Sequence, residues 1–468
     1  MKRVAAIARL TFAEGVRMRI VLGCLLILVF LVVRMPFTLR GDETLTGRLQ
    51  NFLAYGLGAL SLLLSVATIF FSCATLTTEI RERSLHLVLA KPVSRFEILL
   101  GKWLGINLLN VVIVAVCGVA IYGFARYIKA RPEQFSRDSR QLRDVVWTAR
   151  AAATPVQPTT ESGENELQAA ARQKVRQLLD TAAIPKSEER AKYNELLVAE
   201  LAQWRTIPPG YVNEYEFRNL RKPERDDTVM QVRYKARATP LSPDEMVLLG
   251  WQFLDPATGR ELTPIVRTIE RSSYVHHFLV QAAPIIRNGA ARVRIFNLNA
   301  PQLGISVYFD GDDSLQLLYR VGGFEPNYIN ARAMILLKLA LLSAIGLFFS
   351  AFVSFPVACL CTGAFFLICA ASPFILDAIG AHTQMMTPDV DPYGRFGPAV
   401  RKLLVPFLES VFPDFSSYSG TQQIVNGEYI AWGRIGRTIL RTLLYGGVLL
   451  LVPGWYIFER REIAQVTV

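Results

Sequence analysis

The sequence is poor in the residues that hold metal ions or perform catalysis. It has four histidines among 468 residues, and the adjacent pair His276-His277 would point to opposite faces of a strand rather than toward one ion. No H-E-x-x-H or G-x-S-x-G motif occurs. Gly101-Lys102 is no phosphate-binding loop, because Phe96 and Trp103 stand where that loop needs a glycine and a serine or threonine. We therefore expect no catalysis, no ATP hydrolysis and no metal or other cofactor in this chain.

Cysteine is equally scarce, and its distribution excludes a disulfide framework. The six cysteines all lie in apolar runs: Cys24, Cys73, Cys117, Cys359, Cys361 and Cys369. The long polar stretch 126–332 has none, so no disulfide can staple it. Cys359 and Cys361 have no further ligands nearby, and we interpret them as small core residues.

Charged residues make up only 19% of the chain, against about 25% in soluble domains. Four long stretches have no charged residue at all, and a fifth run at 20–33 is apolar throughout. The four stretches are 49–78, 103–125, 339–376 and 442–458. Because a bilayer-spanning helix needs about 20 largely apolar residues, these runs predict membrane spans.

The run 339–376 is too long for one helix, and Pro356 lies within it. The residue before a proline is disfavoured in helical geometry, so we divide the run at Ser354-Phe355-Pro356. The sequence then predicts six spans, at about 20–37, 52–76, 103–125, 333–354, 356–376 and 440–458.

The net charge of +12 is explained better by membrane topology than by nucleic-acid binding, and we expect no nucleic-acid partner. Lys and Arg gather in short loops on the cytoplasmic side of membrane proteins. Residues 1–19 carry five of them against one acid, and the loop 77–102 carries five against three. With an even number of spans, both termini and this loop lie on the cytoplasmic side. Basic residues at 126–131 favour the opposite side, so the charge rule supports this orientation without forcing it.

The expected fold is an α-helical membrane protein with six transmembrane helices and a large extracytoplasmic α+β domain, β-sandwich-like, between spans 3 and 4. Its parts are an interfacial helix at 1–19, spans 1–3 at 20–125 with the loop 77–102, the extracytoplasmic domain at 126–332, spans 4–6 at 333–458 with an extracytoplasmic segment at 377–439, and a cytoplasmic tail at 459–468. A basic tail is the alternative for 1–19. The first apolar run lacks a small-residue cleavage site after Val33 and is interpreted as a retained signal anchor.

The extracytoplasmic domain combines helical and strand patterns. Apolar residues recur at helical spacing in 167–178 and again in 193–204, which predicts two amphipathic helices. In 230–237 apolar and polar residues alternate, which predicts a half-buried strand. Residues 398–412 carry an apolar helical face, either for the membrane surface or for packing on the domain.

The loop 77–102 has more order than a passive connector. Glu79 to about Leu89 can form a short helix, which Lys91-Pro92 ends. Ser94, with Glu97 three residues on, has the capping-box pattern that begins a new helix. Gly101 and Gly105 have G-x-x-x-G spacing, which lets helices approach closely, either within one subunit or between subunits.

This loop and the six-span layout together resemble the ABC-2 type transporter permeases, the membrane-spanning subunits of ABC transporters. The resemblance lies in Glu79-x-Arg81-Glu82-Arg83, then Pro92-x-Ser94-Arg95, then Gly101-Lys102. It implies a dimeric exporter in the bacterial plasma membrane, with a second permease copy or a homologue as partner. It also implies a separate ABC ATPase subunit, which binds ATP and Mg²⁺ and receives the loop as a coupling helix.

The resemblance assigns roles within the loop. It implies that Glu79, Arg81, Glu82, Arg83 and Leu85 contact the ATPase. It implies that Pro92, Ser94, Arg95, Gly101 and Lys102 hold the loop to its own spans or to membrane lipid. The large outer domain departs from the short outer loops of common members, and it would gate export, receive cargo or bind an envelope partner. The alternative is a membrane-anchored envelope binding or scaffold protein that acts through this β-module.

Overall fold

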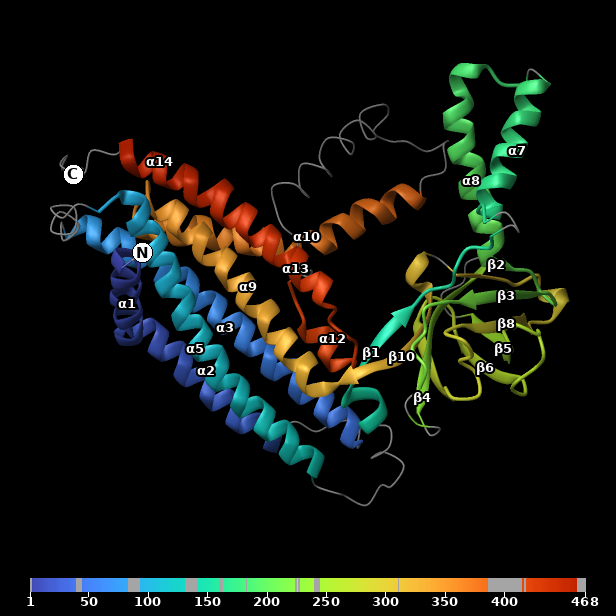
Figure 1. Ribbon diagram of the computed structural model, residues 1–468, viewed down its shortest axis with the longest axis horizontal. Helices are drawn as coiled ribbons and strands as arrows, with labels where there is room; N and C mark the ends of the chain where they lie inside the picture. The colour runs from blue at the N-terminus through green and yellow to red at the C-terminus, as the bar shows by residue number, and fades with distance from the viewer. Residues whose placement is uncertain are drawn as a thin grey trace. The chain divides into compact units, whose positions relative to one another are not determined.

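The computed structural model describes residues 2–38, 44–82, 93–130, 142–159, 163–181, 183–223, 225, 228–239, 245–309, 311–385, 415 and 418–460. The chain divides into two compact units (Figure 1). One unit joins Met1–Trp147 to Gly323–Val468, and the other is Thr148–Gly322. The helix predicted at 398–412 lies outside the described residues, as does the middle of the loop 77–102.

Helices of five to 37 residues make up the described part of the first unit. They are α1 (Lys2–Arg17), α2 (Arg19–Thr38), α3 (Leu45–Arg81), α5 (Arg95–Ala130), η1 (Leu142–Val146), α9 (Phe324–Ser350), α10 (Phe355–Met385), α12 (Thr421–Val425), α13 (Trp432–Thr442), η5 (Leu443–Leu451) and α14 (Val452–Arg460). The last three follow one another without a break, and η1 and η5 are π-helical. α9 ends and α10 begins on either side of 351–354, and Pro356 lies in the first turn of α10, where its missing N–H costs nothing.

By length and composition, five helical segments of the described residues can cross a membrane. They are α3, α5, α9, Phe355–Ser372 and Trp432–Arg460. α1 and α2 meet at a bend of 62°, and this pair becomes a sixth candidate if it is counted as one broken span. Six spans therefore stay a prediction, while the helical, multi-span character of the chain is confirmed.

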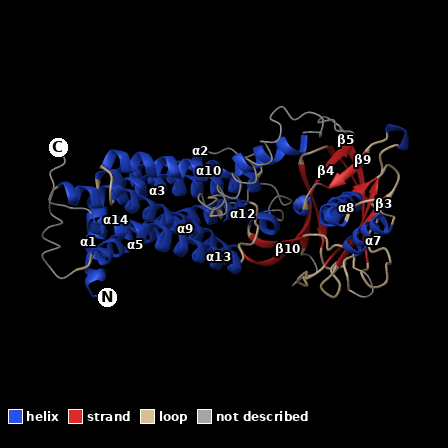
Figure 2. Ribbon diagram, turned by 90° about the horizontal axis from the view of Figure 1, so that it is seen from above, coloured by secondary structure: helices blue, strands red, loops and turns tan. Residues whose placement is uncertain are grey.

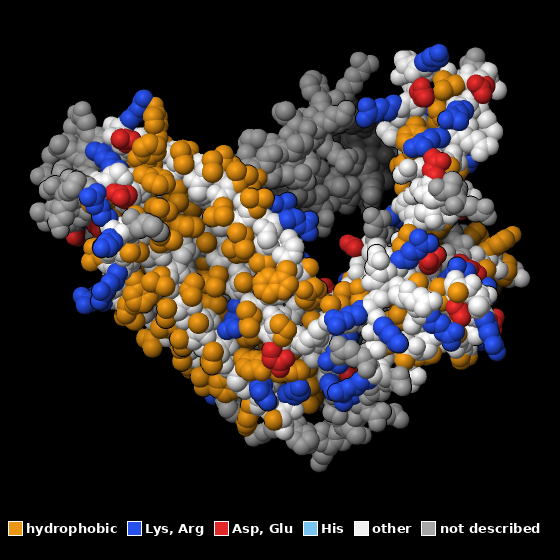
Figure 3. Space-filling view, in the orientation of Figure 1, with side chains coloured by type: hydrophobic (Ala, Val, Ile, Leu, Met, Phe, Trp, Pro, Cys, Tyr) orange, Lys and Arg blue, Asp and Glu red, His pale blue; other side chains and the backbone are white. Residues whose placement is uncertain are grey.

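These helices are apolar on the outside as well as the inside. Leu26 and Leu360 are each 72% exposed and Val119 is 66% exposed, and hydrophobic side chains cover much of the visible helical surface in Figure 3. A soluble protein rarely exposes apolar patches of this extent. The unit is therefore a membrane-embedded bundle, with Phe52 and Ile106 among the fully buried residues of its core.

The second unit is built on two antiparallel sheets, and Figure 2 shows the strands gathered together. The first sheet has the order β1 (Thr148–Ala153), β10 (Leu315–Gly323), β4 (Val229–Thr239), β9 (Ser306–Phe309), β2 (Thr206–Ile207), and β7 (Val275–Gln281) also pairs with β4. The second has the order β3 (Val212–Phe217), β8 (Ala291–Asn297), β5 (Met246–Leu254), β6 (Val266–Arg271).

The core of this unit follows the predicted alternation. In β4, Met230, Val232 and Tyr234 are buried as predicted, on one face of the strand. Gln231, on the opposite face, is buried as well. The Tyr234 ring lies 4.7 Å, centroid to centroid, from Trp251 of β5, so the two sheets share one core.

A helical hairpin stands at one edge of the sheets (Figure 1). It consists of α7 (Glu166–Asp180), the short 3₁₀ helix η2 (Lys186–Glu188) and α8 (Glu189–Arg205). The Asn165 side chain caps α7 by accepting hydrogen bonds from the N–H groups of Leu167 at 3.0 Å and Gln168 at 3.3 Å. α8 runs directly into β2, which ties the predicted helical arm to the sheet.

Candidate coupling site at the start of α5

The described flanks of the loop 77–102 are the C-terminal end of α3 and the N-terminal end of α5. Arg83, Leu85 and Pro92 lie outside the described residues. The site is therefore built from the two flanks and from the helices that they touch.

α5 begins with the capping box that the sequence predicts. The backbone N–H of Ser94 donates to the Glu97 carboxylate at 3.0 Å, and the backbone N–H of Glu97 donates to the Ser94 hydroxyl at 3.2 Å. Two helix-terminal donors are thus satisfied reciprocally. The loop re-enters the helical bundle at a fixed residue with a fixed direction.

Arg95 fastens this first turn to the C-terminal helix. Its guanidinium donates hydrogen bonds to the carbonyl oxygens of Phe458 and Glu459, the second at 3.0 Å. It also lies 5.3 Å from the centroid of the Phe458 ring, within the range of a cation–π contact. The next residue, Phe96, meets Trp455 of α14 edge to face at 6.0 Å. The start of α5 and the end of α14 therefore form one packed corner.

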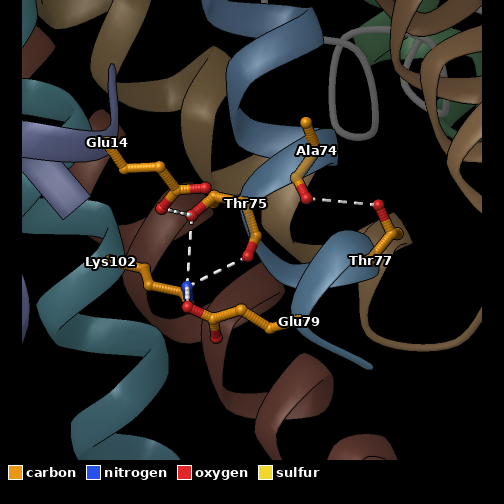
Figure 4. Close-up of polar contacts among 6 residues, drawn as sticks. All are labelled: Glu14, Ala74, Thr75, Thr77, Glu79 and Lys102. Atoms are coloured by element: carbon orange, nitrogen blue, oxygen red, sulfur yellow. Dashed lines mark hydrogen bonds and ion pairs between the residues drawn. The ribbon is translucent and has the colours of Figure 1, made fainter. Parts of the chain in front are cut away.

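Lys102 is buried two turns further along α5, with only 2% of its side chain exposed. Its ammonium lies 2.8 Å from the Glu79 carboxylate and donates to the carbonyl oxygen and the hydroxyl of Thr75, each at 3.1 Å (Figure 4). An ammonium has three N–H donors, so these three partners satisfy it fully. A buried charge is tolerated only when it is paired and hydrogen-bonded in this way. Lys102 thus ties α5 to the last two turns of α3.

The same network continues into α1. The Thr75 hydroxyl donates to the Glu14 carboxylate at 2.9 Å while it accepts from Lys102, and Figure 4 shows Glu14, Thr75, Lys102 and Glu79 in one continuous chain. We call these four residues the anchor network. It links α1, α3 and α5 beside both ends of the loop.

Two glycines let α1 lie directly on α5. A Cβ atom at Gly101 would meet Ile7 at 2.8 Å, and one at Gly105 would meet the carbonyl oxygen of Ala8 at 2.6 Å. Both distances are too short for a real contact, so only glycine allows this approach. The G-x-x-x-G pair therefore packs against a helix of the same chain.

Arg81 and Glu82 remain the exposed charges of the described flank. Their side chains are 76% and 61% exposed and lie 3.9 Å apart, an arrangement that contributes little to stability. Glu79, by contrast, is 22% exposed and engaged with Lys102. Its contact with an ATPase stays a prediction, because the structure gives it a partner inside the chain.

The sequence alone does not indicate the roles of Glu14 and Thr75 in the anchor network. Glu14 is the one acid among the first 19 residues, and Thr75 is a hydroxyl inside an uncharged run. Neither sequence position predicts which residue the side chain contacts. Among the described residues, no group of three His, Cys, Asp or Glu side chains is placed to hold a metal ion.

The long helices with apolar outer surfaces define a multi-pass membrane protein. The anchor network holds both ends of its loop 77–102 to the helices. Residues 5–132 match the family model described as ABC-2 family transporter protein. This match confirms the resemblance to the ABC-2 type permeases over residues 5–132. No curated protein and no solved structure matches the chain. The matched residues include most of α1, all of α2, α3 and α5, and the loop, and they leave out the second unit.

Proposed function

We propose that the chain is the permease subunit of an ABC exporter, driven through the loop 77–102 by a separate ATPase subunit. The anchor network is the observation that supports this most directly. A connector that only joins two spans needs no buried ion pair at its base. A loop that receives a force needs both ends fixed to the helices that must move.

The contacts define where such a force would go. At the α5 end it would pass through Arg95 to α14, and through Lys102 to α3. Through Thr75 and Glu14 it would reach α1. A displacement of the loop would thus be shared by four helices, because packed interiors shift as units rather than deform continuously.

The division of roles within the loop follows from exposure. Arg81 and Glu82, exposed and paired only with each other among the contacts described here, are the charges that remain for an ATPase groove. Ser94, Arg95, Gly101 and Lys102 are engaged inside the chain and act as its anchors.

The remaining elements of the proposal come from the family. The ATPase subunit binds ATP and Mg²⁺, a second permease copy or a homologue completes the transporter, and membrane lipid surrounds it. The complex lies in the bacterial plasma membrane with both termini cytoplasmic. Export, rather than uptake, follows from the same resemblance.

The test is copurification of the full chain with ATP-binding-cassette subunits of its own cell, followed by measurement of ATP hydrolysis. Arg81→Glu with Glu82→Lys should abolish association. Arg143→Glu, at an arginine whose side chain is 51% exposed elsewhere in the same unit, is the control and should leave association intact. Unchanged association and hydrolysis in the charge-reversed variant would refute the coupling role of the loop.

A second variant separates anchoring from docking. Arg95→Gln should retain the ATPase, because the exposed charges are unchanged, but should lower the hydrolysis that the permease stimulates. Its melting temperature must be compared with that of the parent protein. Full stimulation with the Arg95 contacts removed would show that α14 receives no force from the loop.

A second candidate function is an envelope binding or scaffold protein that acts through its β-module. The compactness of Thr148–Gly322, which has its own core, favours it. This candidate requires that charge reversal at Arg81 and Glu82 is harmless to function. The copurification experiment therefore decides between the two.

A further inference from the structure

The helical hairpin of the second unit has an open hollow of about 460 Å³ on its surface. The residues that line it come from α7, η2 and α8: Arg172, Val175, Arg176, Lys186, Ser187, Glu189, Arg190 and Tyr193. A hollow of this size falls within the range of small-molecule sites. We call it the hairpin pocket.

Four of the lining residues are cationic and one, Glu189, is acidic. Arg172 and Arg176 stand four positions apart on α7, and Lys186 and Arg190 stand four positions apart across η2 and α8. Residues at this spacing face the same side of a helix, where like charges repel. Two helical segments thus each direct a pair of cations at the same hollow, and Figure 3 shows basic side chains along the hairpin.

The ion pairs of the hairpin distinguish the cations that line the pocket from those that lie outside it. Lys174 pairs with Glu200 and Lys192 pairs with Glu195, and neither lysine lines the pocket. Arg172 pairs with Glu164 at its edge. Arg176, Lys186 and Arg190 have no ion pair within the described part of the chain. Lys174 and Lys192, outside the pocket, thus each have an acidic partner. Three cations that line the pocket have no such partner in the described residues.

The chemistry of the lining points to one class of anion. A guanidinium presents a rigid fork of donors that matches phosphate oxygens two at a time, and three arginines converge here. The Ser187 hydroxyl adds a further donor, and Val175 with the ring of Tyr193 offers an apolar wall. The volume exceeds what a single phosphate fills, so the pocket has room for the organic group attached to it.

We propose that the hairpin pocket binds a phosphate-bearing ligand with at least two negative charges. The ligand is a phosphate ester whose phosphate lies among Arg176, Lys186 and Arg190 and whose organic part lies against Tyr193 and Val175. A lipid headgroup and a soluble phosphate ester share this chemistry. The inference does not depend on the function proposed for the helical unit.

The experiment uses the full chain in nanodiscs of phosphatidylcholine, with binding measured by titration calorimetry at low salt. The first probe is glycerol 3-phosphate, a soluble phosphate monoester, and the second is dihexanoyl phosphatidic acid, a lipid phosphate monoester, below its micellar concentration. Arg176→Gln with Arg190→Gln should weaken binding by roughly a hundredfold, because each lost charged hydrogen bond lowers affinity about tenfold. Binding should also weaken as sodium chloride is raised.

The matched control is Lys174→Gln with Lys192→Gln. It removes the same net charge from the same two helices, but from residues outside the pocket that already have partners. Its affinity should equal that of the parent protein. Equal weakening by both double variants would show attraction to overall charge and would overturn the site, as would the absence of binding by either probe at millimolar concentration.

The two probes then identify the source of the phosphate. Tighter binding of glycerol 3-phosphate indicates a soluble ester, and tighter binding of the short-chain lipid indicates a headgroup. Either result supports the pocket, provided that the arginine variant no longer binds the probe while its circular dichroism is unchanged and its melting temperature is no lower than that of the parent protein.

Discussion

The anchor network and the hairpin pocket differ in whether their cationic side chains have partners inside the chain. Lys102 is 2% exposed and each of its three donors has a partner. Arg176, Lys186 and Arg190 lie at the surface, and no ion pair reaches them in the residues that the structure describes. A cation whose N–H donors all have partners in the chain holds helices together and has no donor available for a ligand. A cluster of cations without ion pairs contributes little to stability, and its donors are available to bind an anion.

Removing the partner of the buried lysine should have the largest effect. Glu79→Gln removes the carboxylate that is in direct contact with the Lys102 ammonium, and breaking a buried pair in this way costs about 3 kcal/mol. The free energy of unfolding, measured by titration with sodium dodecyl sulfate in detergent, should fall by that order. Glu82→Gln, at a side chain that is 61% exposed, is the control and should leave it unchanged.

The double variant Glu79→Gln with Lys102→Met sharpens this result. It removes both charges, so no uncompensated ammonium remains, and part of the lost stability should return. A double variant that is no more stable than Glu79→Gln alone would show that the ion pair is not what fastens α3 to α5.

The close approach of α1 and α5 should be the next most sensitive feature. Gly105→Ala places a Cβ atom 2.6 Å from the carbonyl oxygen of Ala8, and overpacking of this kind costs about 1–3 kcal/mol. Gly123→Ala lies in the same helix with nothing within 4 Å of the new atom and should be neutral or slightly stabilising. Equal melting temperatures for the two variants would argue against this packing of α1.

The capping box should matter less. Ser94→Ala removes the acceptor for the Glu97 N–H, at a cost of about 1 kcal/mol. Ser94→Thr keeps a hydroxyl in the same place and should retain most of the stability. If the threonine variant is as unstable as the alanine variant, the loss comes from packing rather than from the cap.

Features that depend on neighbouring residues could be predicted from the sequence. The capping box joins residues three positions apart, and the alternation in β4 depends on one strand. The division between α9 and α10 follows from Pro356 and the length of the apolar run. In each case the cause lies within a few residues of its effect.

Features that depend on how helices pack could not be predicted. Lys102 and Thr75 are separated by 27 positions, and Thr75 and Glu14 by 61, so only the packed bundle shows that they meet. The spacing of Gly101 and Gly105 indicated a close approach, but α1 as the partner came from the structure. The bend of 62° between α1 and α2 likewise has no signal in the apolar run that follows it.

The smallest effect on stability should come from the hairpin pocket, and it completes the contrast with Lys102. Arg176→Gln with Arg190→Gln removes two cations that have no ion pair in the described structure, so unfolding should change by no more than about 0.5 kcal/mol. Relief of like-charge repulsion along the helices can even raise the melting temperature slightly. Lys174→Gln with Lys192→Gln removes two real ion pairs and should be the less stable of the two variants, since exposed pairs contribute about 0.2–1 kcal/mol. If the arginine variant instead lost as much stability as Glu79→Gln, Arg176 and Arg190 would have a structural role. The contrast between Lys102, which stabilises the fold, and the cations of the hairpin pocket, which do not, would then be wrong.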